Sequence, residues 1–468
     1  MVVEWWSVLP FVILLLSIAV LPLLPATEHA WEKNSVKLLV ALACGIPVAL
    51  WFVIAGHGGE VVHALFEYVQ FIMLLLALFV VSGGIFLAGD IRATPRNNTI
   101  FLAIGGVIAS FIGTTGAAML LIRPLLNTNK ERAHRVHTVV FTIFIVANCG
   151  GLLTPLGDPP LFLGFLRGVP FEWTFRLWVE WLFVNALLLL TYYALDRRAY
   201  ARETDEAIAF DETDVTPLRI RGEMNFVFFA VIIAAVAFVP SLDLHAIETG
   251  HATLAQMVPW RELVFLAAAL GSYLLGDREV RFSLNQFTWA PILEVAALFI
   301  GIFLAMIPAL NFLGQVAPQL PLNEVTFFVF SGGLSAFLDN APTYATFFEM
   351  ASQLPGEPRI GMAPGVPEAY LVAISLGSVL CGAITYIGNG PNFMTKAVAD
   401  SAGVAMPSFG GYLRWSLMYL VPILIAMVAV FIADGIVWTI LGLLLAGGIG
   451  ARAVRLARSN VHPSEMDD

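Results

Sequence analysis

Charge is what this sequence most conspicuously lacks. Only 12% of its 468 residues are Asp, Glu, Lys or Arg, whereas 59% are hydrophobic. An apolar stretch of about 20 residues is long enough to cross the hydrocarbon core of a bilayer, and the chain contains many such stretches, beginning with 8–24. The composition therefore predicts a polytopic membrane protein.

Cysteines and clustered basic residues are also scarce. The three cysteines, Cys44, Cys149 and Cys381, lie in apolar segments, which disfavours a disulfide framework. The net charge is −10, and no block of Lys and Arg resembles a nucleic-acid site. We therefore expect membrane lipid, and no nucleic acid, around the protein. No basic segment precedes 8–24, so we expect this run to remain as the first spanning helix.

The apolar runs predict an all-α membrane protein with about 11 transmembrane helices. These runs lie at 8–24, 36–55, 66–88, 138–165, 173–195, 224–240, 259–276, 289–313, 369–395, 409–431 and 435–451. Two further apolar stretches, 99–127 and 323–352, are interrupted midway by GTTG and by LDNAPT. Each is either one long helix or a pair of half-helices that enters and leaves on the same face.

The distribution of basic residues distinguishes these options, because cytoplasmic loops accumulate Lys and Arg. Arg92 and Arg96 precede 99–127, and basic residues from Lys130 to Arg135 follow it. Both flanks are therefore predicted to be cytoplasmic, as a re-entrant hairpin requires. The flanks of 323–352 carry almost no basic residue and are predicted to lie outside. The two hairpins then open to opposite faces of a plasma (inner) membrane, with the N-terminus outside and the C-terminus cytoplasmic.

Hairpins of opposite orientation indicate inverted repeats. TPLGDPPLF (154–162) lies over TYIGNGPNF (385–393), and SFIGTTG (110–116) lies over AFLDNAP (336–342). About five crossings separate the hairpins, and this odd number turns one copy upside down. The predicted organisation is N-terminal scaffold helices at 1–65, a first repeat at 66–195, a cytoplasmic linker at 196–223, scaffold helices at 224–288, a second repeat at 289–431, and a C-terminal helix with a cytoplasmic tail at 432–468. The linker is so rich in charge that we expect a solvated or partly ordered loop and not a catalytic domain.

The candidate site lies where the repeats interrupt their helices, at 138–165 and 369–395. An ionised carboxylate at bilayer depth costs about 2.5–3.5 kcal/mol on insertion scales, so Asp158 favours a functional break over a simple kink. The side chains at these breaks and at the hairpin tips carry oxygen atoms that suit a hard cation such as Na⁺. The predicted ion- or substrate-binding residues are Thr114, Thr115, Asp158, Asp339, Asn340, Thr385, Asn389 and Asn392.

Proton coupling is assigned to the acids of this set. Asp158 and Asp339 are the predicted Na⁺ ligands and also the candidates to carry a proton, so cation and proton would compete for one place. Glu294 is a third candidate acid, with a snorkelling carboxylate at the membrane interface as an equal alternative. We expect no cofactor, only Na⁺ and H⁺ as transported or coupling ions.

At these residues the chain resembles the ion transporter superfamily, which includes NhaD-type sodium/proton antiporters, arsenite permeases, citrate transporters and divalent-anion/sodium symporters. The resemblance rests on FLDNAPT in the second hairpin, on GDPP and GNGPN at the breaks and on the two-hairpin layout, over about residues 66–431. It implies a homodimer in which a scaffold domain holds a mobile transport domain of hairpins and broken helices that moves as an elevator.

The resemblance also implies two ion sites. Carried over by position, they fall at Thr114 and Thr115 with Asp158, and at Asp339 and Asn340 with Asn389. The tips read GTTG and DNAP where the dicarboxylate branch has Ser-Asn-Thr. This departure favours an acid-based cation site over carboxylate recognition.

Three functions are consistent with these residues. The leading hypothesis is sodium/proton antiport. The alternative is Na⁺- or H⁺-coupled transport of citrate, another carboxylate or arsenite. Under both hypotheses the expected substrate is a small inorganic ion or a small anion. We expect the protein not to be an enzyme. A remote alternative is an intramembrane aspartyl protease, but Asp158 comes after Pro-Leu-Gly and not after a Gly-x-Gly run.

Overall fold

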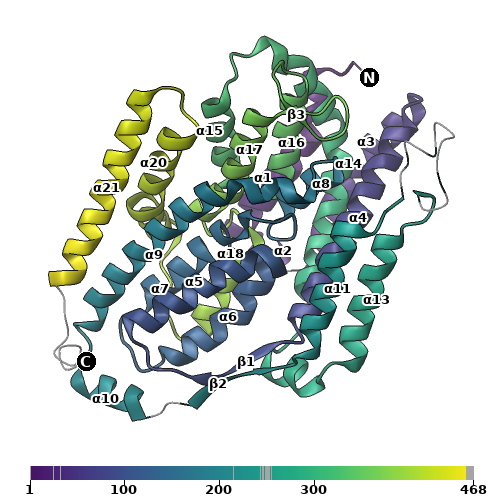
Figure 1. The fold of residues 1–468 in the computed structure, drawn as a ribbon. Coiled ribbons are helices and arrows are strands. Elements are labelled where there is room, and N and C mark those ends of the chain that lie inside the picture. Colours follow the sequence, from purple (N-terminus) through teal and green to yellow (C-terminus); the bar gives the residue numbers. More distant parts are fainter. Residues whose placement is uncertain are drawn as a thin grey trace.

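The computed structural model describes residues 2–24, 26–31, 33–213, 216–242, 244, 247, 253 and 256–459. These residues are mostly helical (Figure 1). Within them, six segments are long and apolar enough to cross a membrane, namely Asn34–Ile54, Gly58–Ser82, Phe171–Tyr200, Ala290–Gln319, Phe409–Phe431 and Ile436–Ser459. Shorter apolar helices accompany them. The prediction of an all-α membrane protein is confirmed.

Every predicted apolar run contains a helix. The uninterrupted ones are α1 (Leu9–Val20), α3 (Asn34–Ile54), α4 (Gly58–Ser82), α9 (Trp178–Tyr200), α11 (Met224–Phe238), α13 (Trp260–Leu275), α14 (Ala290–Val316) and α21 (Ile436–Ser459), and the run at 409–431 forms α19 (Phe409–Trp415), a π-helical turn and α20 (Val421–Phe431). A short helix, α2 (Glu28–Trp31), precedes α3.

Helices α3 and α14 lie against each other along one side of the molecule (Figure 1). Glycine allows this close approach, because a Cβ atom on Gly301 would lie 2.4 Å from the carbonyl oxygen of Ala41. Beside them, α4 packs against α13 and α14, and α11 packs against α13. These helices include most of the segments predicted as scaffold.

Both interrupted stretches form pairs of packed helices and not single long ones. The first pair is α5 (Pro95–Ile112) and α6 (Thr114–Thr128), divided by Gly113, whose φ of +84° is strained for other residues. The second pair is α15 (Glu324–Ser335) and α16 (Asn340–Ser352). In Figure 1, α5 and α6 lie towards the end that carries β1 and β2, whereas α15 and α16 lie towards the end that carries β3.

The two broken helices repeat one backbone pattern. Helix α7 (Val136–Ile145) is followed by a 3₁₀ turn and then by α8 (Pro159–Leu166), and α17 (Glu368–Leu380) by a 3₁₀ turn and then by α18 (Gly390–Ser401). The residue before the second helix is extended in both cases, with φ/ψ of −141°/142° at Asp158 and −151°/142° at Asn389. A proline in the first turn of α8 and of α18 suits a helix start.

The prediction of a helix through residue 88 is wrong. Helix α4 ends at Ser82, next to two glycines, and β1 (Phe86–Asp90) pairs antiparallel with β2 (Thr216–Arg221) from the linker. Of the two forms expected for the linker, the partly ordered one fits the structure, because α9 continues to Tyr200 and α10 (Asp205–Thr213) comes next. A second small sheet joins β3 (Arg359–Ile360) to β4 (Val366–Pro367).

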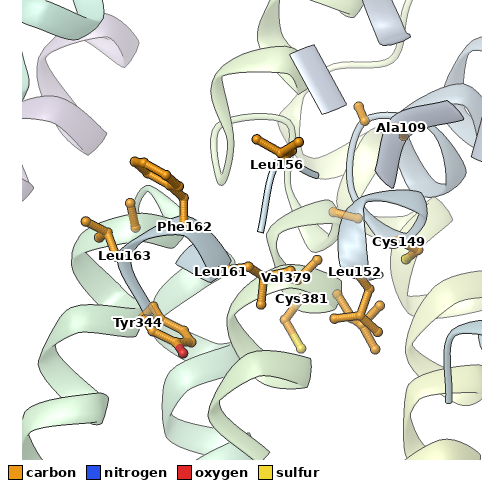
Figure 2. Packing of buried hydrophobic residues seen from close by; sticks show 14 of the residues in the cluster. Ala109, Cys149, Leu152, Leu156, Leu161, Phe162, Leu163, Tyr344, Val379 and Cys381 are labelled. Carbon is orange, nitrogen blue, oxygen red and sulfur yellow. The ribbon is translucent and has the colours of Figure 1, made fainter. Parts of the chain in front are cut away.

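An apolar core surrounds the helix breaks. Figure 2 shows Leu152 of the first break near Cys381 of the second break and Val379 of α17, with Leu156 farther along the first break. All three cysteines are free, as the sequence predicts, and Cys149 and Cys381 are buried. The polar residues of the breaks are therefore enclosed by hydrocarbon, where their hydrogen bonds must be made within the protein.

Candidate functional site

Asp158 lies at the centre of a buried hydrogen-bonded cluster. Its side chain is 1% exposed, at the start of α8. One carboxylate oxygen accepts a hydrogen bond from Thr114 Oγ1 at 3.0 Å, and the other accepts one from Asn340 Nδ2 at 2.8 Å. A longer contact of 3.4 Å comes from Asn389 Nδ2. Both hairpin tips and both helix breaks thus meet at one carboxylate, although the residues are far apart in the sequence.

Asn148 extends this cluster and was missed by the sequence analysis. Its Nδ2 donates to Asn392 Oδ1 at 2.6 Å, and its Oδ1 accepts from Asn389 Nδ2 at 3.2 Å. Asn392 in turn donates to the carbonyl oxygens of Gly382 and Thr385 at 2.8 and 3.1 Å. The available signal was a lone amide inside the otherwise apolar run 143–153, directly before the first break.

The Asn340 amide lies between the Ser335 hydroxyl and the Asp158 carboxylate. Ser335 Oγ lies 2.6 Å from Asn340 Oδ1 and 2.6 Å from the carbonyl oxygen of Ser378. With its oxygen facing this hydroxyl, the amide presents its NH₂ group to Asp158. Ser335 and Asn340 are completely buried, so this arrangement is shielded from water.

In each half of the chain, one threonine connects the helix break to the hairpin of that half. Thr154 Oγ1 donates to the carbonyl oxygen of Ser110 and accepts from the N–H of Leu156. Thr385 Oγ1 donates to the carbonyl oxygen of Ala336 and accepts from the N–H of Ile387. The two sets of contacts join residues that the sequence repeat aligns. This agreement supports the inverted repeat at the level of single hydrogen bonds.

Four helices begin around the carboxylate. Helices α6 and α16 start at Thr114 and Asn340, and α8 and α18 start directly after Asp158 and Asn389. A helix N-terminus carries a positive partial charge through N–H groups that have no partner within the helix. Helix α8 begins with Pro159 and Pro160, which have no N–H, and the N–H of Thr114 at the start of α6 donates to the carbonyl oxygen of Gly157. The hydroxyl and amide oxygens of the cluster are ligands of the kind that Na⁺ takes.

The remaining predicted site residues lie at or beyond the edge of the cluster. Thr115 is half-buried and contributes none of the hydrogen bonds described above. Asp339 is half-buried at the start of α16, where its Oδ1 accepts from the N–H of Ala341 at 3.1 Å. Glu294 lies on α14, is 45% exposed, and pairs with Lys37 Nζ on α3 at 2.6 Å. The structure thus brings Glu294 to the contact between α3 and α14.

The cluster contains one carboxylate among neutral groups. Across the described ranges, no group of three or more His, Cys, Asp or Glu side chains is placed to hold a metal ion. Asp158 takes its hydrogen bonds from a hydroxyl and two amides, and Asp339 caps its own helix. The two aspartates thus have separate partners and do not form a hydrogen-bonded pair, so their geometry offers no support for the aspartyl protease alternative.

Comparison with known families extends these observations. The family model described as "Putative citrate transport" matches residues 1–432, which include both hairpins, both broken helices and every residue of the Asp158 cluster. No curated protein sequence matches the chain. The match agrees with the resemblance that FLDNAPT, GDPP and GNGPN indicate. The chain therefore belongs to this citrate transport family, among the citrate transporter relatives of the ion transporter superfamily.

Proposed function

We propose that this secondary transporter exchanges Na⁺ for H⁺, with Asp158 as the group that binds the two ions in turn. The observation that carries the proposal is the environment of Asp158, which is 1% exposed and accepts hydrogen bonds from neutral side chains alone. A buried carboxylate without a cationic partner is costly to keep ionised. Binding of a cation or of a proton removes that cost, and the two ions exclude each other.

The same neighbours are suited to both states. The Thr114 hydroxyl can rotate from donating to Asp158 to offering a lone pair to a cation. Asn340 and Asn389 supply amide groups from the second half of the chain. We propose that Asp339, one residue before Asn340, adds negative charge at the entrance to the site, and that the hairpins and broken helices move together as an elevator in a homodimer.

A second candidate is Na⁺- or H⁺-coupled transport of citrate or another small carboxylate. It is favoured by the family match over residues 1–432, and helices α6, α16 and α18 also begin at the cluster. Helix N-termini bind anionic groups through their unpaired N–H groups. In this case a cation at Asp158 would neutralise the carboxylate and admit the substrate anion beside it.

Fluorescence dequenching separates the two candidates. The purified protein is reconstituted into liposomes that carry a pH gradient, and Na⁺, Li⁺, K⁺, citrate and arsenite are added one at a time. Antiport predicts that Na⁺ or Li⁺ alone releases the gradient and that K⁺ does not. A response that requires citrate, with none to Na⁺ alone, would reject antiport and select the second candidate.

A further inference from the structure

A groove of about 540 Å³ lies between α9, α20 and α21, and none of its lining residues belongs to the Asp158 cluster. In Figure 1 these three helices form one edge of the molecule, and α21 is the outermost of them. The groove is lined along much of its length by apolar residues such as Pro422, Leu444, Leu445 and Ile449. Its apolar part thus runs along helices that are long enough to span the membrane.

Small residues create this groove. Helices α9 and α21 meet through Ala194, Ala453 and Ala457, which form a buried cluster of their own. Further along α21, Gly448 lines the groove, and a Cβ atom added there would meet nothing within 4 Å. The space is therefore open at that point of the helix surface and is not filled by a neighbouring side chain.

Three arginines line the same groove at the ends of two helices. Arg198 stands in the last turn of α9, and Arg452 and Arg455 stand near the end of α21. All three side chains are exposed, and none has a hydrogen bond or an ion pair with any other residue that the structure describes. Within the described part of the chain these three guanidinium groups thus have no acidic partner, although the net charge of the chain is −10.

We propose that this groove binds an acidic glycerophospholipid from the cytoplasmic leaflet. Guanidinium groups match the geometry and charge of a phosphate. The apolar groove that continues from them accommodates an acyl chain, which a free phosphate ion does not have. The positive-inside assignment puts Arg198, Arg452 and Arg455 on the cytoplasmic side, where acidic lipids are presented. This proposal is independent of the transported ion.

Native mass spectrometry of the full-length protein in detergent tests the charge requirement. The protein is titrated with phosphatidylglycerol and, separately, with phosphatidylcholine, and we expect retention of the first only. Arg198→Gln, Arg452→Gln and Arg455→Gln should each weaken phosphatidylglycerol binding about fivefold, since a basic residue near an acidic lipid contributes about 1 kcal/mol. Arg458→Gln is the matched control, because Arg458 is exposed on the same helix but does not line the groove.

A steric variant tests the acyl-chain requirement. Gly448→Phe should fill the groove and abolish retention of phosphatidylglycerol, whereas Gly447→Phe should not. Gly447 is the control because a Cβ there also meets nothing within 4 Å but the residue does not line the groove. Inorganic phosphate at millimolar concentration should fail to displace the lipid.

Four results would overturn the proposal. Equal retention of the two lipids would remove the role of the arginines. Displacement by phosphate would assign the site to a free anion. A change of oligomeric mass in Gly448→Phe, with lipid still bound, would assign the groove to a contact between copies of the chain. Retention that appears only when Glu465, Asp467 and Asp468 are replaced by Gln and Asn would assign the arginines to the chain's own acidic end.

Discussion

Two buried aspartates, Asp158 and Asp196, differ in whether a basic side chain lies next to the carboxylate. Asp196 is fully buried and lies 2.6 Å from Arg132 and 2.7 Å from His137. Asp158 is equally buried but has only hydroxyl and amide donors. The charge of Asp196 is compensated within the protein, which suits a structural role. The charge of Asp158 is left for a ligand to compensate.

Substitution of Asp158 by Asn should abolish coupling. The amide keeps the volume and can still accept from Thr114, but it cannot exchange a proton. We expect cation-evoked dequenching in proteoliposomes to fall to the level of protein-free liposomes, while the variant elutes from size exclusion like the wild type. If this variant exchanges ions at the wild-type rate, Asp158 is not the coupling group.

Asp339→Asn should give a milder defect. The sequence assigns equal roles to the two aspartates, but Asp339 caps α16 through the N–H of Ala341, and an asparagine oxygen can form the same cap. We expect transport to persist with a raised apparent Km for the cation, because a nearby negative charge is lost. Complete loss of exchange in a correctly folded Asp339→Asn protein would make Asp339 a second coupling acid.

At the scale of elements, Thr154 and Thr385 each form a hydrogen bond that holds one helix break against the hairpin of the same half. Thr154→Val and Thr385→Val should each lower the free energy of unfolding by about 1–3 kcal/mol, because a buried hydrogen bond to a carbonyl is lost. Thermal unfolding in detergent measures this as a lower Tm. Thr346→Val is the control, since Thr346 Oγ1 bonds to Pro342 within one helix. Equal stability of all three variants would show that Thr154 and Thr385 do not hold the breaks against the hairpins.

Helix α10 docks through Asp211, whose carboxylate accepts hydrogen bonds from the N–H of Ala93. Burial raises the pKa of Asp211 from 3.8 to about 6, and Glu131 and Asp90 add to this rise, whereas the Ala93 hydrogen bond and Arg132 oppose it. The folded protein therefore binds the proton more tightly than the unfolded chain. The docked state is most stable below about pH 4 and loses stability as the pH rises to about 6.

Hydrogen exchange of residues 205–213 tests this dependence. After correction for intrinsic rates, protection should fall between pH 4 and pH 6 and stay constant above pH 7. In Asp211→Asn, which retains an oxygen acceptor for Ala93, protection should not vary over this range. An unchanged pH dependence in that variant would assign the titration to another group.

Helices were predicted from the sequence better than long-range contacts were. Long apolar runs located the spanning helices, and breaks at Asp158 and Asn389 located the site, because both signals are local. Strand β1 was missed because its pairing partner β2 lies beyond α9, and pairing across such a distance leaves no local pattern. The role of Asn148 was missed for the same reason, since its partners belong to the second half of the chain.

At the scale of the whole molecule, the charge distribution predicts which end faces the cytoplasm. The linker helix α10 and the end of α21 lie at the same end of the molecule in Figure 1, opposite to the start of α1 and to β3. This arrangement agrees with termini on opposite sides of the membrane. It leaves the direction to the positive-inside rule.

Cysteine labelling fixes that direction. Thr213→Cys lies exposed at the end of α10 and should be labelled in whole cells only by membrane-permeant reagents. Gln319→Cys, exposed beyond α14, should be labelled by impermeant reagents as well. A Cys44→Ala background removes the half-buried native thiol. The reverse pattern would invert the whole topology.

The matched contacts of Thr154 and Thr385 have a consequence for energetics. If each half can adopt the conformation of the other, the inward-open and outward-open forms make the same kinds of contacts and differ little in free energy. A ligand that binds both forms equally shifts neither. Net flux must then draw its direction from the gradients across the bilayer, and inverting those gradients should drive the same molecule in reverse.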